Sequence, residues 1–272
     1  MKIAVHQMCS TTVPSINVEN IVKGVRQASA NGAQFYFAPE MSVLIDRNRK
    51  RAAASIASEV SNASLGKICE AAASEKIWVH LGSVPVLHED GSGRWANRTI
   101  VIDNMGAIRA RYDKMHLFDV DLSTGESWRE SSAYRGGDGP VLVDTPLGLM
   151  GLTICYDMRF PDLYSHLAQA GAQIFAVPAA FTVPTGAAHW HVLLRARAIE
   201  TASFVIAAAQ CGVHEDGRAT YGHSLVVDPW GEVLLDMGDA PGLGFVDLDL
   251  TRIATVRAQI PVHLNRRVIA AI

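Results

Sequence analysis

Three reactive side chains each come directly after a predicted β-strand: Glu40, Lys114 and Cys155. Because ligand sites in α/β proteins form beyond the carboxyl ends of the strands, these side chains could meet in one pocket. A cysteine attacks as its thiolate and therefore needs a base to take its proton. No histidine lies in the turn that holds Cys155, so Glu40 is the candidate base. Lys114 would favour the thiolate and stabilise the oxyanion of a tetrahedral intermediate.

The chain contains four cysteines, and Cys155 is the favoured nucleophile. It stands directly before a predicted helix N-terminus, whose dipole would lower the pKa of the thiol. The same sharp turn would place the backbone N–H of Tyr156 near the oxyanion. Cys211 also ends a predicted strand, but a glycine follows it, and a redox-sensing role is an alternative for this residue. Cys9 and Cys69 are interpreted as packing residues.

Short apolar runs alternate with segments of helical spacing, which predicts an α/β fold. Predicted strands occupy residues 2–7, 35–38, 77–84, 99–103, 108–112, 149–154, 174–177, 204–209, 224–228, 233–236 and 244–248. Predicted helices occupy residues 17–29, 65–73, 161–170 and 189–203. Helical crossovers and hairpins occur together, which favours a mixed sheet. No linker or repeat divides the chain, so residues 1–272 are expected to form a single domain.

Composition and charge argue against several classes of protein. Hydrophobic residues make up 49% of the 272 residues and charged residues 19%, which is typical of a folded domain. The formal charge of −3 leaves no basic excess with which to bind nucleic acid. No apolar run approaches the ~18 residues of a membrane span, and the N-terminus lacks a signal-peptide pattern. The cysteines are far apart in the sequence, so a cytosolic protein with reduced thiols is expected.

The motifs indicate neither a metal nor a nucleotide cofactor. His189 and His191 are two residues apart, so on a helix they point in different directions and make a poor metal pair. The chain contains no His-Glu-x-x-His motif, no Walker A loop and no Gly-x-Gly-x-x-Gly sequence. The predicted chemistry therefore uses side chains alone and needs no cofactor.

Three segments around the reactive residues resemble one family. They read FAPEM around Glu40, YDKMHLFDVD around Lys114 and CYDMRFPDLY around Cys155, in the family's order. Over essentially its whole length the chain resembles the nitrilase, or carbon–nitrogen hydrolase, superfamily. The resemblance implies a four-layer αββα sandwich with mixed sheets, a Glu–Lys–Cys triad and a homodimer in which sandwich packs on sandwich. It also implies a second glutamate, at Glu130; Glu126 lies nearby, but its neighbours match the pattern less well.

The resemblance further implies an acyl-transfer mechanism. Glu40 would take the thiol proton while Cys155 attacks the amide carbon and Lys114 steadies the oxyanion. The amine would leave after protonation, and water activated by Glu40 would hydrolyse the remaining thioester. Glu130 would hold Lys114 and the substrate in place.

The C-terminal half is most similar to the deaminated-glutathione amidase branch, through the segments AHWHVLLRARAIET, AAQCG and YGHSLVVDPWG. In that branch the substrate is an α-keto acid amide, formed when glutathione loses its amino group, and cleavage yields 2-oxoglutarate and cysteinylglycine. Because such a substrate is anionic, Arg159 is the candidate carboxylate partner, with a structural salt bridge as the alternative. Tyr156, Phe181 and Thr182 are expected to line the pocket.

Three alternative functions remain at this point. An ω-amidase acting on α-ketoglutaramate shares the acyl half of the substrate and releases ammonia. A nitrilase in the strict sense fits less well, because the resemblance is to the amidase branches. A catalytically silent binding or scaffold member would be expected to lack a reactive residue, and none is lacking. Residues 123–131 and 260–272 depart from the family pattern, which bears on the pocket rim and the dimer.

Overall fold

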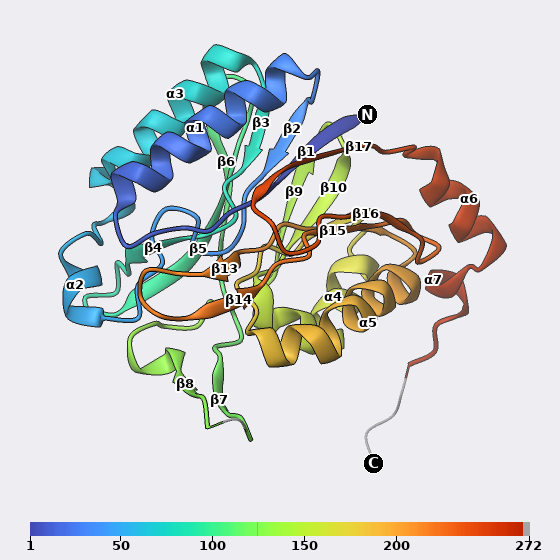
Figure 1. Cartoon of the computed structure of the whole chain (residues 1–272). Coiled ribbons are helices and arrows are strands. Elements are labelled where there is room, and N and C mark those ends of the chain that lie inside the picture. Colours follow the sequence, from blue (N-terminus) through green and yellow to red (C-terminus); the bar gives the residue numbers. More distant parts are fainter. Residues whose placement is uncertain (124, 269–272) are drawn as a thin grey trace.

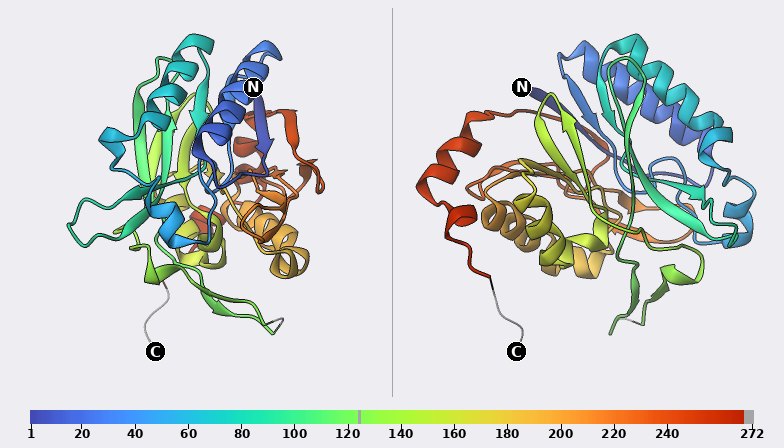
Figure 2. Two further views of the ribbon diagram at one scale, coloured as in Figure 1. Left: turned by 60° about the vertical axis from the view of Figure 1, so that its left-hand side comes forward. Right: turned by 180° about the vertical axis from the view of Figure 1, so that it is seen from behind.

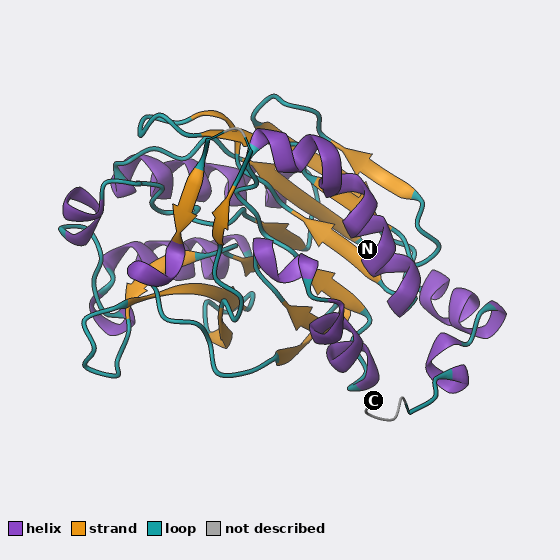
Figure 3. Cartoon of the chain, turned by 90° about the horizontal axis from the view of Figure 1, so that it is seen from below, coloured by secondary structure: helices purple, strands orange, loops and turns teal. Residues whose placement is uncertain are grey.

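Two mixed β-sheets lie face to face between two layers of helices in the computed structural model, which describes residues 1–123 and 125–268 (Figure 1). Turned views show the same succession of layers from the side and from behind (Figure 2). Figure 3 gives the view from below, with helices, strands and loops distinguished by colour. This succession confirms the expected αββα sandwich with mixed sheets. Within the described residues, no helix is both long and apolar enough to cross a membrane.

The first sheet has seven strands. They are β1 (Lys2–Gln7), β2 (Phe35–Phe37), β3 (Trp78–His80), β4 (Val84–Leu87), β5 (Trp95–Ile102), β6 (Ile108–Asp113) and β17 (Gly242–Asp247). Their order is β17-β1-β2-β3-β5-β4, and β6 also pairs with β5. β1, β2 and β3 run parallel, whereas β17 and β5 run antiparallel to their neighbours β1 and β3. The carboxyl ends of the three parallel strands therefore meet at one edge.

The second sheet has six strands. They are β9 (Val141–Thr145), β10 (Gly148–Leu152), β11 (Ile174–Ala176), β12 (Phe204–Ala207), β15 (Leu225–Val227) and β16 (Val233–Asp236), in the order β16-β15-β12-β11-β10-β9. β10, β11 and β12 run parallel, and the outer strands run antiparallel. This sheet too presents the carboxyl ends of three parallel strands at one edge.

Two apolar cores join the layers. The outer helices are α1 (Pro14–Ala30) and α3 (Ala63–Glu75) on the first sheet, and α4 (Pro161–Gln169) and α5 (Val183–Thr201) on the second. Ile3 and Val5 of β1 belong to the core between the sheets, which also contains Met150 and Leu152 of β10. Ala4 belongs to the core beneath α1 and α3. Successive residues of β1 thus face opposite layers, and both faces are covered.

Smaller elements surround the edge at which the parallel strands end. They are α2 (Arg49–Ala53), η1 (Glu59–Ser61), β7 (Asp119–Asp121), β8 (Ser127–Arg129), η2 (Glu130–Ser132), η3 (Cys155–Arg159), β13 (Cys211–Val213) and β14 (Ala219–Tyr221). The hairpins β7–β8 and β13–β14 are paired antiparallel. The chain continues after β17 into α6 (Thr251–Gln259) and α7 (Val262–Asn265).

Most predicted elements are confirmed, but several boundaries are wrong. The predicted strand 77–84 is two strands, β3 and β4, because the chain turns at Gly82 with φ +75°. The predicted helices 17–29 and 189–203 begin earlier, at Pro14 and Val183, and proline occupies the first turn of each. The strands β7, β8, β9, β13 and β14 and the helices α2, α6 and α7 were not predicted. Parts of the divergent segments, residues 124 and 269–272, lie outside the described residues.

Candidate active site

The carboxyl ends of β2, β6 and β10 open into one cavity of about 270 Å³. Glu40 lies in the loop after β2, Lys114 directly follows β6, and Cys155 lies just beyond β10. All three line the cavity, together with Glu130 at the start of η2. The structure thus brings together the four residues that the sequence singles out for catalysis.

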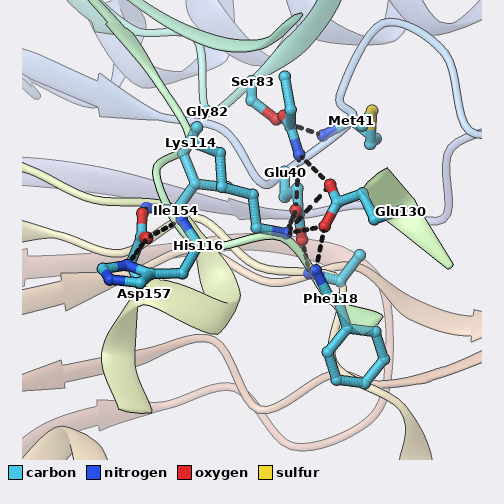
Figure 4. A network of polar contacts seen from close by, with 12 residues as sticks. Glu40, Met41, Gly82, Ser83, Lys114, His116, Phe118, Glu130, Ile154 and Asp157 are labelled. Carbon is cyan, nitrogen blue, oxygen red and sulfur yellow. Dashed lines mark hydrogen bonds and ion pairs between the residues drawn. The ribbon is translucent and has the colours of Figure 1, made fainter. Parts of the chain in front are cut away.

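The ammonium group of Lys114 lies between two carboxylates (Figure 4). Lys114 Nζ donates to Glu40 Oε1 at 2.9 Å, and to Glu130 Oε2 at 2.9 Å and Oε1 at 3.2 Å. Glu130 Oε2 also accepts from the backbone N–H of Phe118 at 2.7 Å. The Lys114 side chain is only 2% exposed. Such a buried cation is stable here because both neighbouring carboxylates offset its lost hydration.

Glu40 is held at every oxygen. Its Oε1 accepts from Asn97 Nδ2 at 2.9 Å in addition to Lys114, and its Oε2 accepts from the backbone N–H of Ala180 at 2.8 Å. Its carbonyl oxygen accepts from Gln210 Nε2 at 2.9 Å. Ala180 and Gln210 follow β11 and β12 of the second sheet, so both sheets position this carboxylate. Asn97 Nδ2 also donates to Glu130, at 3.2 Å.

Burial opposes charge on Glu40 and Lys114, but their attraction outweighs it. Burial acts to raise the pKa of Glu40, while the charge and hydrogen bond of Lys114 bring that pKa below its ordinary value. Burial acts to lower the pKa of Lys114, while Glu130 and Glu40 raise it well above its ordinary value. Both groups are therefore charged at neutral pH.

Cys155 occupies a strained turn between β10 and η3. Its φ is 49°, in the left-handed region that residues with a side chain rarely adopt. Its backbone N–H donates to Pro178 O at 2.9 Å, which ties the turn to the strand end of β11. Strained residues of this kind cluster at functional sites, because the surrounding structure must hold them in place. The side chain is nearly buried and lines the cavity.

The expectation of a lowered Cys155 pKa is wrong for the resting site. Burial raises the pKa of this thiol well above its ordinary value, and the negative charge of Glu40 adds to the rise. Lys114 opposes the rise without reversing it. The helix dipole is outweighed because a buried thiolate would lie beside a charged carboxylate. Cys155 is therefore a neutral thiol next to a charged base before any substrate binds.

Asp157 connects the Lys114 loop to the Cys155 turn, a role that sequence reasoning missed. Its Oδ2 accepts from Tyr112 Oη at 2.7 Å and from the backbone N–H of Ile154 at 2.8 Å. Its Oδ1 accepts from the backbone N–H of His116 at 3.0 Å and lies 2.7 Å from that residue's Nδ1. Figure 4 shows His116 and Ile154 converging on this carboxylate. The signal was present in the sequence, since Tyr112, His116 and Asp157 all belong to the matched segments.

The loop after β3 lies directly against the backbone that carries Glu40. A Cβ atom on Gly82 would stand 1.9 Å from Pro39 O and 2.4 Å from Ala38 O, so no side chain fits there. The backbone N–H of Met41 donates to Ser83 Oγ at 2.9 Å, which joins the two loops (Figure 4). Glu40 is thus positioned by a close approach that only glycine permits.

One family model matches residues 2–258 of the chain, that of the carbon–nitrogen hydrolases. The chain is 36% identical to the deaminated glutathione amidase of Yersinia enterocolitica, over 99% of this chain and 94% of that protein. It is 43% identical to the deaminated glutathione amidase of Mus musculus, over 97% of this chain and 83% of that protein. The chain belongs to the carbon–nitrogen hydrolase family.

The crystal structure of the Caenorhabditis elegans NitFhit protein agrees with this assignment. It superposes with a TM-score of 0.89 at 38% identity, over 98% of this chain and 65% of that one. The predicted membership of the nitrilase superfamily is confirmed, and with it the reaction class, hydrolysis of carbon–nitrogen bonds.

The wall of this hydrolase's cavity contains three of the four residues predicted to bind the substrate. Tyr156, Phe181 and Thr182 line it, as expected. Arg159 is not among the lining residues of the described chain; its guanidinium lies 5.2 Å from the Phe181 ring centroid, and its Nη1 lies 3.2 Å from His189 Nδ1. Arg159 thus lies against the rings of two lining residues, Tyr156 and Phe181, and its contact with a substrate carboxylate stays a prediction.

Four arginines that sequence reasoning missed line the cavity: Arg47, Arg49, Arg129 and Arg218. The guanidinium groups of Arg47 and Arg218 lie over the ring of Trp128, at 5.7 Å and 5.2 Å from its centroid. Arg218 forms an ion pair with the buried Asp216, Nε to Oδ2, at 2.8 Å. Arg47 is exposed and forms no ion pair with any described residue. No local motif marks Arg47, because only the fold brings it to the cavity.

Cys211 has none of the features found around Cys155. Its side chain is completely buried at the start of β13, and burial raises its thiol pKa to about 12. It does not line the cavity of the carbon–nitrogen hydrolase. The choice of Cys155 over Cys211 is therefore supported by the position of Cys155 in the cavity wall, and not by a lower thiol pKa.

Proposed function

We propose that this carbon–nitrogen hydrolase is an amidase that cleaves deaminated glutathione to 2-oxoglutarate and cysteinylglycine. The observation that carries the proposal is the ammonium group of Lys114, held between Glu40 and Glu130 in the cavity that Cys155 lines. The names of the relatives at 36% and 43% identity support the choice of substrate. No cofactor takes part in the proposed reaction.

The first half of the reaction forms a thioester. As Cys155 Sγ bonds to the amide carbon, its proton moves to the Glu40 carboxylate, and the carbonyl π electrons move to oxygen. Concerted transfer suits this site, because the high thiol pKa disfavours a free thiolate. The developing oxyanion is stabilised by Lys114 and by the backbone N–H of Tyr156 in the first turn of η3, where helical N–H groups lack partners. Glu40 then protonates the leaving nitrogen, and the carbon–nitrogen bond breaks.

The second half releases the acid. Glu40, again a carboxylate, takes a proton from water as the water oxygen attacks the thioester carbon. The carbon–sulfur bond breaks, and the proton returns to Cys155. Throughout, Glu130 fixes the position of Lys114, because two of the three hydrogen bonds of that ammonium group go to Glu130.

The carboxylates of the substrate require cations in the cavity wall, and Arg47 is the proposed partner. Arg218 and Arg129 already pair with Asp216 and Asp121, and Arg49 donates to Arg129 O at 2.9 Å and to Ser132 Oγ. The exposed guanidinium of Arg47 has no carboxylate partner among the described residues. Arginine binds carboxylates through two parallel hydrogen bonds. Trp128, whose ring lies beneath Arg47 and Arg218, restricts the positions that Arg47 can adopt.

A comparison of two substrates tests the proposal. Purified protein is incubated with deaminated glutathione and with α-ketoglutaramate, and kcat/KM is measured for each. A clear preference for deaminated glutathione supports the proposed activity. A preference for α-ketoglutaramate would instead make the protein an ω-amidase with the same catalytic residues. Inactivity on both would refute the substrate class.

The same assay tests Arg47. Arg47→Gln is expected to lower kcat/KM for deaminated glutathione about 10- to 100-fold, since a charged hydrogen bond is worth about 1.5–3 kcal/mol. A lower kcat/KM with both substrates would show that Arg47 binds the acyl half that they share. A lower kcat/KM with deaminated glutathione alone would show that Arg47 binds the glycine carboxylate. Arg94→Gln is the control, because Arg94 is exposed and does not line the cavity. Equal rates for Arg47→Gln and wild type would contradict the role.

A catalytically silent scaffold is the remaining alternative. Cys155→Ala is expected to abolish turnover and to leave the circular dichroism spectrum and the unfolding midpoint close to wild type. Wild-type rates in this variant would show that Cys155 is not the nucleophile.

We also propose that residues 1–272 act as one domain, in the cytosol and as a homodimer. The single domain is supported by β17, which pairs with β1 across the whole length of the chain.

The homodimer is supported by exposed apolar side chains on and beside α5: Val192, Ile199 and Trp230. Gel filtration with light scattering measures the mass in solution.

A further inference from the structure

Three potential metal ligands from three separate elements meet outside the cavity. His191 lies on α5, His223 precedes β15, and Asp236 ends β16. His191 Nε2 lies 2.8 Å from Asp236 Oδ2, and His223 Nδ1 lies 2.9 Å from Asp236 Oδ1. One ligand atom from each residue lies within 4.8 Å of the other two. The spacing of histidines along α5 could not indicate this group, because its other members come from distant segments.

The surrounding structure orients the three side chains. His223 has φ 55°, in the left-handed region, and its backbone N–H donates to Gly238 O at 2.6 Å. Its ring is stacked on Tyr221, with centroids 4.5 Å apart and planes 24° from parallel. Asp236 Oδ1 also accepts from the backbone N–H of Gly238, at 3.0 Å. A strained backbone held by several partners is typical of a functional position rather than an incidental surface contact.

We propose that His191, His223 and Asp236 bind a divalent transition-metal ion of the Zn²⁺ class. Two imidazole nitrogens and one carboxylate oxygen are a common zinc ligand set. Bond lengths of ~2.0–2.2 Å place tetrahedral ligand atoms about 3.3 Å apart. The separations of 2.8 Å and 2.9 Å join the two imidazoles to different oxygens of Asp236. With one atom from each residue, all separations lie within 4.8 Å, so binding needs the widest of them to close by at most about 1.5 Å. Both ring nitrogens already face the same carboxylate.

The site is open to an incoming ion and separate from the proposed chemistry. The side chains of His191, His223 and Asp236 are 34%, 27% and 35% exposed. None of the three lines the cavity that holds Cys155. With three protein ligands, a tetrahedral ion keeps one position for water or another donor. A bound ion would tie α5 to the β15–β16 hairpin.

Zinc titration tests the proposal without interference from the nucleophile. The full chain, free of any affinity tag and carrying Cys155→Ala, is stripped with a chelator and titrated with Zn²⁺ by calorimetry. One ion per chain is expected. The further change His191→Gln should weaken binding at least tenfold. His189→Gln is the matched control, because His189 lies on the same helix but faces Arg159, and its affinity should equal that of the parent.

A second variant and a second readout guard against misfolding. His223→Asn removes a ligand yet keeps a residue that tolerates the left-handed conformation. It should weaken binding as His191→Gln does, with an unchanged circular dichroism spectrum. Co²⁺ should give tetrahedral d–d absorption bands in the parent that are lost in both variants. No binding by the parent, or equal affinity in His191→Gln and the parent, would overturn the proposal and leave a hydrogen-bonded histidine–aspartate cluster.

Discussion

The positive charge of Lys114 serves two purposes: it compensates two carboxylates in the resting site, and it stabilises the oxyanion in the proposed reaction. Its ammonium group compensates Glu40 and Glu130, and in the proposed reaction it also receives the charge that develops on the substrate oxygen. The three groups together carry one net negative charge, so the resting site disfavours a thiolate at Cys155. This balance explains why proton transfer and nucleophilic attack are expected to occur together.

Removal of this ammonium group should impair both functions. Lys114→Ala is expected to lower kcat by at least the roughly 10²–10³-fold typical of one lost oxyanion donor. It should also destabilise the fold, because two neighbouring carboxylates lose their shared cation. Steady-state kinetics and urea unfolding measure the two effects, with the exposed Lys67→Ala as the control. A decrease in kcat of less than tenfold would show that Lys114 does not stabilise the oxyanion.

The residues that carry reactive groups could be predicted, whereas those that position them could not. Glu40, Lys114 and Cys155 stand out because each follows a predicted strand. Asn97 is hidden inside β5, and Arg47 belongs to a run of surface charges. Their roles depend on contacts between segments far apart in the chain, which no local pattern encodes. The same holds for the Cys155 pKa, where burial and Glu40 outweigh the helix dipole.

At the level of elements, the wrongly predicted strand 77–84 marks a functional feature. Its apolar pattern continues through Gly82, so the sequence reads as one buried strand. The chain instead turns there and packs backbone against backbone with the Glu40 loop. Exits of strands were predictable from the end of each apolar run, but a turn inside such a run depends on tertiary packing.

Gly82→Ala should therefore reduce activity although residue 82 carries no reactive group. The added methyl group would push the Pro39 carbonyl away and shift Glu40, and we expect kcat/KM to fall at least tenfold. The control is Gly66→Ala in α3, where nothing lies within 4 Å of the added atom. That change should leave activity intact and stabilise the fold slightly, since alanine favours a helix. Equal activity for Gly82→Ala and wild type would show that the close approach at Gly82 does not position Glu40.

The packing of α1 against β1 and β2 makes stability depend on pH. His6 is buried, its Nδ1 lies 2.6 Å from Tyr36 Oη, and burial lowers its pKa from 6.5 to about 4. Between pH 6.5 and 4 the unfolded chain binds this proton and the folded chain does not. The free energy of unfolding therefore falls as the pH is lowered. The loss from this group reaches about 3 kcal/mol.

Urea unfolding at several pH values measures this effect. His6→Gln should flatten the dependence of unfolding free energy on pH between 6.5 and 4, and the exposed His166→Gln should not. An unchanged slope in His6→Gln would show that other groups cause the acid sensitivity.

For the whole molecule, the apolar side chains on the outer face of α5 bear on the proposed homodimer. Val192 is 68% exposed on this helix, which is unusual for a valine on a layer that otherwise faces solvent. Val192→Lys is expected to shift the protein to the monomer mass in light scattering, because burying an unpaired cation is costly. Val60→Lys is the control, since Val60 is 95% exposed and lies on η1, far along the chain. A dimer that survives Val192→Lys would place the interface elsewhere.

The proposed catalytic groups are divided between the two sheets. Glu40, Lys114 and Glu130 precede the loop at residues 138–140, whereas Cys155 and the backbone of Ala180 follow it. After a break in that loop, neither fragment would hold a complete site. The later fragment would still contain β17, whose six residue pairs with β1 provide a specific point of reassembly. The enzyme is thus a natural candidate for a split reporter, in which turnover signals that two fused partners have met.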